Sequence, residues 1–96
     1  NDVNDLFILA SIVEKETFIK EEKSIIAGVF YNRFKKNMKL QSDPTVVYAI
    51  TLGKKKMGRK LLRKDLKIKS KFNTYVNKGL PPERLSIPGI DSLIAT

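Results

Sequence analysis

The sequence predicts a mainly α-helical fold in a single small domain, and three observations support this prediction. Apolar residues recur at helical spacing in two long segments of the chain. The pair Asp43-Pro44, a typical helix start, opens a third apolar segment. The chain has 96 residues and a 42% apolar content, which suit one modest core and argue against intrinsic disorder.

The first helix is expected over residues 5–19. Its apolar stripe falls on one side of a helical wheel and consists of Leu6, Leu9, Ile12 and Val13. Glu16 falls on the same side of the wheel, between Leu9 and Ile12. A Glu in an apolar stripe needs an explanation, because Glu is almost never fully buried without a partner.

The second helix is expected from residue 21 or 22 to residue 36. Its apolar side consists of Ile26, Val29, Phe30 and Phe34. Acidic residues at its start and basic residues at its end suit the helix dipole. Asn37 is a suitable left-handed stop for this helix.

The third helix is expected to begin with Asp43 as its N-cap residue and Pro44 in the first helical position. It is expected to end at Gly53, a typical helix terminator. Beyond it we expect one helical turn over residues 61–66, an irregular segment over 72–88 and a short helical start over 90–96.

The composition restricts the chemistry that this chain can perform. It contains no Cys and no His, so it lacks disulfides, catalytic thiols, the commonest metal ligands and the commonest proton shuttle. It has no glycine-rich phosphate loop, and we expect no metal and no cofactor. No apolar run reaches the roughly 18 residues of a membrane span. Any catalysis is expected to come from carboxylates, hydroxyls, amides or lysines.

The formal net charge of +9 is concentrated in one segment. Residues 54–71 hold ten basic residues and one acidic residue, Asp65, while the remainder of the chain is neutral. A charge run of this kind is typical of a solvated face. It also suits an anionic partner such as nucleic acid, phospholipid headgroups or a wall polymer.

Glu16 has two interpretations on the residues alone. It is either a partly exposed or lysine-paired Glu at the end of the stripe, or a carboxylic acid kept protonated by desolvation. A protonated Glu could act as a general acid on a glycosidic bond. A hydrolase of this type needs a second carboxylate. Asp43 is the best candidate for it, although helix capping explains that residue sufficiently.

The turn-rich segment offers a second group of candidates, because Asn73, Thr74 and Tyr75 place amide and hydroxyl groups on irregular backbone. Such groups line polysaccharide clefts, and they are equally typical of ordinary turns.

Five motifs follow one another along the chain. They are residues 10–17 (ASIVEKET), 29–33 (VFYNR), 40–46 (LQSDPTV), 73–75 (NTY) together with 79–82 (GLPP), and 88–89 (PG). In this order and spacing they resemble the endolytic murein transglycosylases of the MltG (YceG-like) family. The resemblance covers nearly the whole chain except residues 54–71. Phe72 and residues 83–85 depart from it, since the family usually has Tyr at the first position and Gly-Pro-[IL] at the second.

The resemblance implies a lysozyme-like lytic transglycosylase catalytic core, mainly α here and α+β in the full domain, with irregular cleft loops. It implies that Glu16 is catalytic, first as general acid and then as base. The substrate cleft is implied to include Gln41, Asp43, Asn73, Thr74 and Tyr75. The implied reaction cleaves the MurNAc-β-1,4-GlcNAc bond of peptidoglycan without water and leaves a 1,6-anhydro ring on MurNAc, which terminates nascent glycan strands.

The same resemblance implies a setting for the chain. Residues 1–96 would be a single domain that forms part of the catalytic domain, without the family's upstream membrane anchor and LysM-like region and its downstream strand-rich segment. The implied location is the extracytoplasmic side of the bacterial cytoplasmic membrane. The implied partners are peptidoglycan glycan strands and peptidoglycan synthases at the membrane.

Two alternatives accompany this interpretation. One is a lysozyme-type muramidase that uses Asp43 as its second carboxylate. The other is a module that binds nucleic acid or another anionic polymer through residues 54–71. We expect no nucleic-acid partner, because that segment lacks a recognisable reading helix and interleaved aromatic residues. Anionic headgroups or wall polymer suit it better.

Overall fold

The computed structural model describes residues 3–54, 56–86 and 94–96, and every regular element in these ranges is helical. In chain order the elements are α1 (Val3–Glu16), α2 (Lys20–Lys35), α3 (Asp43–Thr51) and a short 3-10 helix, η1 (Arg63–Lys67). The mainly α fold is therefore confirmed for the described residues. Within the same ranges, no helix combines the length and apolar character that a membrane span requires.

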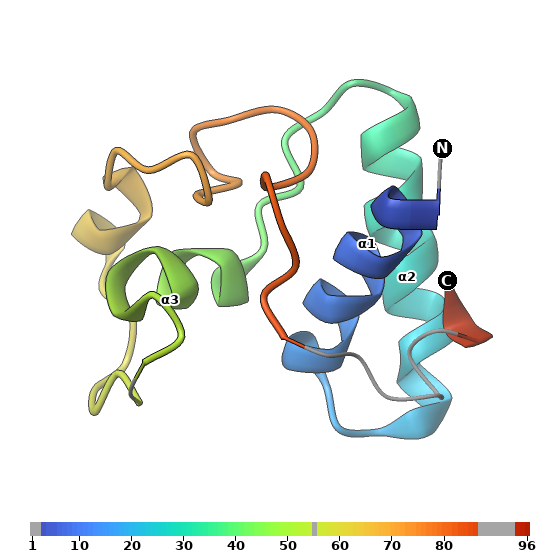
Figure 1. Cartoon of the computed structure of the whole chain (residues 1–96), viewed down its shortest axis with the longest axis horizontal. Helices are drawn as coiled ribbons and strands as arrows, with labels where there is room; N and C mark the ends of the chain where they lie inside the picture. The colour runs from blue at the N-terminus through green and yellow to red at the C-terminus, as the bar shows by residue number, and fades with distance from the viewer. Residues whose placement is uncertain (1–2, 55, 87–93) are drawn as a thin grey trace.

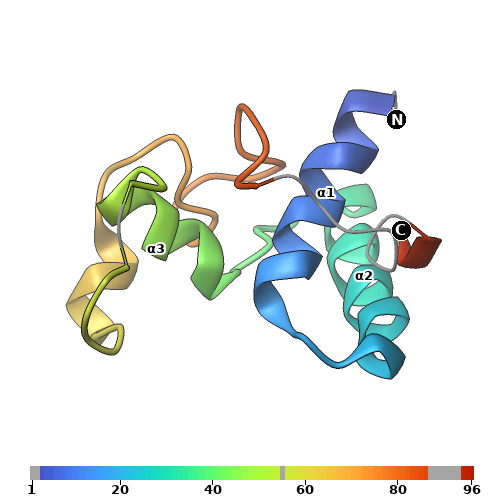
Figure 2. The same cartoon turned by 60° about the horizontal axis from the view of Figure 1, so that its bottom comes forward.

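Helices α1 and α2 lie side by side and run in opposite directions (Figure 1; Figure 2). Apolar residues on the facing sides of these two helices form most of the core. Residues from later in the chain complete it. The buried core consists of Leu9, Ile12, Val13, Ala27, Phe30, Leu40, Phe72 and Leu85. Leu6, at the outer end of the predicted stripe, is instead 41% exposed.

Helix α1 ends at Glu16, earlier than the expected position near residue 19. The hydroxyl of Thr17 accepts a hydrogen bond from the Ile19 N–H at 3.1 Å and donates one to Oε1 of Glu22, also at 3.1 Å. These bonds turn the chain directly into α2. As a result, Glu16 lies at the carboxyl end of α1, where the helix dipole disfavours a negative charge.

The start of α3 differs from the expectation. Ser42, with an extended backbone, is the N-cap residue, and Asp43 is the first residue of the helix. The prediction that Asp43 is the N-cap is therefore wrong, and no side chain caps the helix by a hydrogen bond. The expected end is confirmed more closely, since left-handed Leu52 is followed by Gly53 at φ 74°.

The irregular segment that follows η1 returns from the α3 side of the molecule to α1 (Figure 1). The Leu85 N–H donates to Oγ of Ser11 in α1 at 3.0 Å, which fixes the far end of this segment. The expected turn over 61–66 is present as η1, displaced by about two residues. The expected helical start over 90–96 and the motif at 88–89 lie largely outside the described residues.

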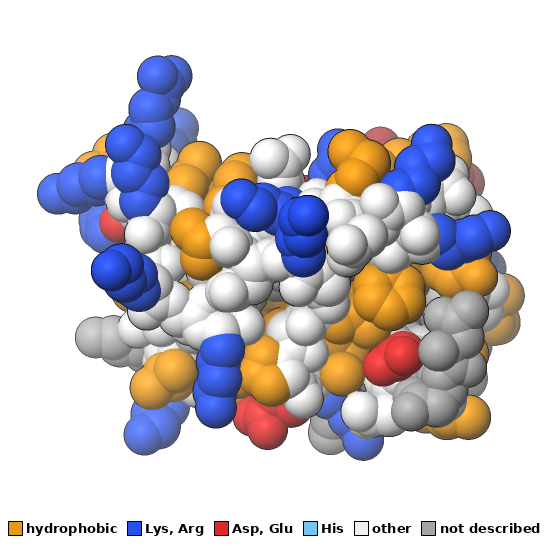
Figure 3. Space-filling view, turned by 90° about the horizontal axis from the view of Figure 1, so that it is seen from above, with side chains coloured by type: hydrophobic (Ala, Val, Ile, Leu, Met, Phe, Trp, Pro, Cys, Tyr) orange, Lys and Arg blue, Asp and Glu red, His pale blue; other side chains and the backbone are white. Residues whose placement is uncertain are grey.

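The described residues of the basic segment, 54 and 56–71, form the end of the molecule that carries η1, where Figure 3 shows Lys and Arg side chains gathered. Every described basic residue of this segment is exposed. Its single acid, Asp65, accepts two hydrogen bonds from the Arg59 guanidinium, at 2.7 and 3.1 Å, and one from the Leu62 N–H at 2.7 Å. The Arg59 and Leu62 bonds lower the pKa of Asp65 to about 2. The described part of this segment is a solvated face that contains the Arg59–Asp65 ion pair.

Candidate active site

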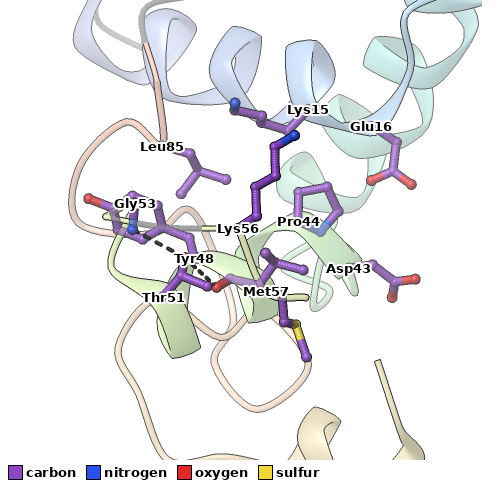
Figure 4. Close-up of a pocket in the computed structure, with 11 residues that line it drawn as sticks. Lys15, Glu16, Asp43, Pro44, Tyr48, Thr51, Gly53, Lys56, Met57 and Leu85 are labelled. Atoms are coloured by element: carbon purple, nitrogen blue, oxygen red, sulfur yellow. Dashed lines mark hydrogen bonds between the residues drawn. The ribbon is translucent and has the colours of Figure 1, made fainter. Parts of the chain in front are cut away.

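A cavity of about 590 Å³ opens between the carboxyl end of α1 and helix α3 (Figure 4). Its lining carries two carboxylates, those of Glu16 and Asp43, and two ammonium groups, those of Lys15 and Lys56. The apolar part of the wall comes mainly from Pro44, Val47, Tyr48, Met57 and Leu85. The structure thus places two of the predicted site residues, Glu16 and Asp43, in one concave site.

Glu16 lies at the edge of this cavity, and its Oε2 accepts a hydrogen bond from Oγ of Ser42 at 3.2 Å. Burial of the carboxyl group raises the pKa of Glu16 above its ordinary value. The Ser42 hydrogen bond acts against this rise, the Asp43 charge acts with it, and the Arg33 charge acts against it. Glu16 therefore keeps its proton to a higher pH than an ordinary Glu does.

Each of the two interpretations of Glu16 describes part of what the structure shows. The residue is exposed at the end of the stripe, yet its carboxyl group is sufficiently desolvated to raise its pKa. In the described part of the chain, no Lys or Arg lies within ion-pair distance of it. The lysine-paired interpretation is therefore wrong for these residues, and a proton-donating Glu16 is consistent with the geometry.

Ser42 is a site residue that the sequence reasoning missed. It is 1% exposed, and its N–H donates to Oγ1 of Thr74 at 2.9 Å. Its hydroxyl points to Glu16 instead of capping α3. A Ser before Asp-Pro signals only a helix start, because the contact with Glu16 joins residues that lie 26 positions apart in the sequence.

The backbone of Ser42 is held by a pair of buried threonines. The hydroxyl of Thr45 donates to the Ser42 carbonyl at 2.7 Å and lies 2.8 Å from the hydroxyl of Thr74. Since the Thr45 proton is directed to the carbonyl, the Thr74 hydroxyl donates in that second bond. The Thr74 N–H donates to Thr45 Oγ1 as well, at 3.2 Å. The network joins the turn-rich segment to the start of α3 and so fixes the donor to Glu16.

The lining of the cavity includes neither Asn73 nor Thr74. Asn73 is fully buried; its Nδ2 donates to the carbonyls of Leu66 and Ile68, and its Oδ1 accepts from the Tyr75 N–H. Thr74 is 2% exposed and fully engaged with its neighbours. A direct contact of either residue with substrate stays a prediction.

Gln41 and Tyr75 lie nearer the surface. Gln41 is exposed, adopts a left-handed backbone with φ 56°, and donates its N–H to the Thr74 carbonyl at 3.2 Å. The Tyr75 hydroxyl donates to Oδ1 of Asp43 at 2.5 Å, a short bond of the charge-assisted type. Burial, this hydrogen bond and the Asp43 charge raise the pKa of Tyr75 to about 12. Asp43 therefore has one oxygen bound to a phenol that stays protonated.

The wall of the cavity is supported by an aromatic pair. The Phe72 ring packs 4.8 Å from the Tyr48 ring, centroid to centroid, at an interplanar angle of 52°. A Cβ added at Gly53 would lie 2.9 Å from Cε1 of the same tyrosine, so the turn after α3 also requires a residue without a side chain. Phe72 contributes here through apolar packing. In the described ranges no cluster of three or more acidic side chains could hold a metal ion.

The chain is similar to proteins that are already known. The model of the YceG-like family matches residues 1–96. A relative from Bacillus subtilis (strain 168), named endolytic murein transglycosylase, is 48% identical over 90 residues, which are 94% of this chain and 24% of the relative. A relative of the same name from Streptococcus pneumoniae serotype 2 (strain D39 / NCTC 7466) is 38% identical over 96 residues, covering 95% of this chain and 17% of the relative.

A solved structure extends the comparison to the fold. The crystal structure of the yceG-like protein lmo1499 from Listeria monocytogenes has a TM-score of 0.84 and 46% sequence identity, over 97% of this chain and 29% of that chain. This chain spans less than a third of each of these three proteins. Since the family model matches its whole length, the chain belongs to the YceG-like family.

Proposed function

We propose that this chain is the core of the catalytic domain of an endolytic lytic transglycosylase that cleaves MurNAc-β-1,4-GlcNAc bonds in peptidoglycan. One observation carries the proposal: the carboxyl of Glu16 lies in the lining of the cavity with a raised pKa. The names of the relatives from B. subtilis and S. pneumoniae support peptidoglycan as the substrate class.

The reaction uses Glu16 twice. Protonated Glu16 gives its proton to the glycosidic oxygen as the bond between that oxygen and C1 of MurNAc breaks. The Glu16 carboxylate then accepts the proton of the MurNAc C6 hydroxyl, whose oxygen bonds to C1 and closes a 1,6-anhydro ring. Bonds and protons balance without water, and Glu16 ends in its starting form. A lysozyme-like core with a single catalytic acid, which the motifs imply, suits this sequence of steps.

The surroundings of Glu16 suit a group that gives and then accepts a proton. Burial and the Asp43 charge favour the protonated form that the first step needs. The Ser42 hydrogen bond favours the carboxylate that the first step produces. These influences oppose each other, and the effect of burial is the larger of them. Ser42 is thus a positioning residue for Glu16.

Asp43 supports this reaction better than it supports a second catalytic carboxylate. Its Oδ1 is the acceptor of the Tyr75 hydroxyl, which limits its freedom to attack a sugar or activate water. Its charge instead raises the pKa of Glu16. We therefore favour the transglycosylase over a muramidase that would use Asp43, with Gln41, Asp43 and Tyr75 as the cleft residues that lie at or near the surface.

The proposal extends to the setting of the domain. Residues 1–96 would belong to a membrane-anchored protein and would lie on the extracytoplasmic side of the membrane. There they would act on glycan strands beside peptidoglycan synthases. The exposed basic side chains of residues 54–71 would face anionic headgroups or wall polymer. Binding of this surface would weaken as salt rises, because exposed charges are screened within about 10 Å at 0.1 M ionic strength.

The test compares full-length protein carrying Glu16→Gln with the wild type on purified peptidoglycan. Mass spectrometry of the products is expected to show a loss of anhydro-muropeptide release of about 10²- to 10⁴-fold. Glu21→Gln makes the same chemical change at an exposed position of α2 and is expected to keep wild-type release. Undiminished release by Glu16→Gln would contradict the assignment.

A further inference from the structure

The lining of the cavity includes two basic side chains besides its carboxylates. Lys15 precedes Glu16 in α1, and Lys56 comes from the loop after α3; both line the same cavity. Figure 4 shows the Lys56 side chain extending toward Lys15. The carboxylates of Glu16 and Asp43 lie to the right of both lysines in this view. We propose that Lys15 and Lys56 form a subsite for a carboxylate of the peptide that peptidoglycan carries on MurNAc. This inference rests on the proposed function.

The two ammonium groups have no acidic partner in the described part of the chain. Other cations do: Lys23 pairs with Glu14 at 3.5 Å, and Arg59 pairs with Asp65 at 2.7 Å. Two like charges on one cavity repel each other, and an anion between them turns this repulsion into attraction. The subsite is therefore suited to a negatively charged group.

The chemistry of the substrate identifies that group. The sugar backbone of peptidoglycan is uncharged, and the lactyl group of MurNAc forms an amide with the peptide. The carboxylates of a peptide-bearing strand therefore belong to the peptide. The peptide branches from MurNAc, the sugar whose C1 would lie at Glu16. Because Lys15 and Lys56 line the same cavity as Glu16, a branch that leaves this sugar and follows the cavity would meet the two lysines.

The rest of the cavity fits a short peptide. Its volume of about 590 Å³ falls in the range of small-molecule sites, about 300–1,000 Å³, and leaves room for more than the group that reacts. Val47, Met57 and Leu85 give it an apolar wall beside the lysines. Alanine methyl groups would lie against this wall, while a carboxylate would meet the ammonium groups.

The test measures binding without turnover. Full-length protein carrying Glu16→Gln is titrated against fluorescently labelled, soluble glycan strands that bear peptides. Adding Lys15→Gln and Lys56→Gln together is expected to weaken binding about tenfold, as for two partly exposed charge contacts. Lys36→Gln with Lys39→Gln removes the same charge from exposed positions beyond α2, outside the cavity lining, and is expected to change affinity less than twofold. Lys→Arg at both cavity positions keeps the charge and is expected to retain most of the affinity.

Two further strands identify the bound group. On strands whose peptide carboxylates are converted to amides, the parent protein is expected to bind as weakly as the double Gln variant binds unmodified strands. The lysine changes are expected to cause no additional loss on the amidated strands. On peptide-free strands, which expose the lactyl carboxylate, the lysine changes are expected to have no effect. A tenfold loss on peptide-free strands would assign the site to the lactyl group and overturn the peptide assignment.

The proposal is overturned if the double Gln variant, folded by its melting temperature, binds peptide-bearing strands as tightly as its parent. It is also overturned if the double Gln variant loses affinity equally on amidated strands. Both outcomes concern binding by a protein that does not turn over. They are therefore distinct from a failure of the proposed function, which would appear as wild-type protein that releases no anhydro products.

Discussion

The hydroxyl of Ser42 donates a hydrogen bond to Oε2 of Glu16 at 3.2 Å, although Ser42 holds the N-cap position of α3. A Ser at this position usually accepts a bond from the first turn of its own helix. Here the side chain instead joins the start of α3 to the end of α1. Burial raises the pKa of Glu16, and the hydrogen bond from Ser42, at the start of another helix, acts against that rise.

Replacing Ser42 with Ala is expected to shift the pH dependence of the reaction. The Ser42 hydrogen bond lowers the pKa of Glu16, so its loss raises that pKa further. Glu16 must be protonated to act as the acid, and the alkaline limb of kcat/KM therefore moves to higher pH. The melting temperature should change little, because Ser42 does not cap α3. A limb that stays in place or moves to lower pH would contradict this role.

Replacing Asp43 with Asn is expected to shift the same limb in the opposite direction. The Asp43 charge raises the pKa of Glu16, so a neutral amide lowers that pKa and the limb moves to lower pH. Asn keeps an oxygen that can accept the Tyr75 hydroxyl. We expect kcat at the optimum to fall by less than about tenfold, against about 10²- to 10⁴-fold for a lost acid–base residue. A loss of the larger size, measured by anhydro-muropeptide release, would favour a second catalytic carboxylate.

The Tyr75 phenol provides a spectroscopic test of its contact with Asp43. Its pKa is raised to about 12 by burial, by the hydrogen bond to Asp43 and by the Asp43 charge. Ultraviolet absorbance of tyrosinate, taken as the difference between wild type and Tyr75→Phe, should therefore titrate near pH 12. In the Asp43→Asn background the Tyr75 titration should move to lower pH. Identical titrations with and without the Asp43 carboxylate would show that the contact is absent in solution.

A substitution of Asn73 distinguishes a structural role of this residue from a contact with substrate. Its buried amide makes three hydrogen bonds, with the carbonyls of Leu66 and Ile68 and the N–H of Tyr75, at 3.0, 2.9 and 2.8 Å. Removing it leaves two carbonyls and one N–H without that partner, so Asn73→Ala should lower the free energy of unfolding by about 2–3 kcal/mol. Asn32→Ala, at an exposed position of α2, serves as the control in thermal unfolding. Unchanged unfolding with weakened glycan binding would instead make Asn73 a substrate contact.

Much of this arrangement follows from local patterns in the sequence. The apolar stripes predicted α1 and α2 because helical spacing determines which side chains face the core. The wheel also indicated Glu16, since an acid on an apolar stripe is an exception that needs a partner or a function. The predicted end of α1 was wrong by three residues, because the hydroxyl of Thr17 bonds to Glu22 and turns the chain early.

The contacts that complete the site could not be predicted in this way. Ser42 meets Glu16, and Tyr75 meets Asp43, across 26 and 32 positions of sequence, and neither pair has a spacing that a helix or turn would reveal. The Asp-Pro pair predicted a helix start correctly but assigned the cap to the wrong residue. Asn73 and Thr74 are buried and form hydrogen bonds within the protein, because the irregular backbone has buried polar groups that need partners.

We propose that Glu16 drives cleavage without water, and product analysis in water labelled with heavy oxygen tests this role most directly. Full-length wild type and Glu16→Gln are incubated with peptidoglycan in this solvent, and the new glycan ends are analysed by mass spectrometry. We expect the wild type to form 1,6-anhydroMurNAc ends that carry no heavy oxygen, and we expect Glu16→Gln to form at least about 100-fold fewer of them. Reducing MurNAc ends that carry the label, or equal release by the variant, would contradict it.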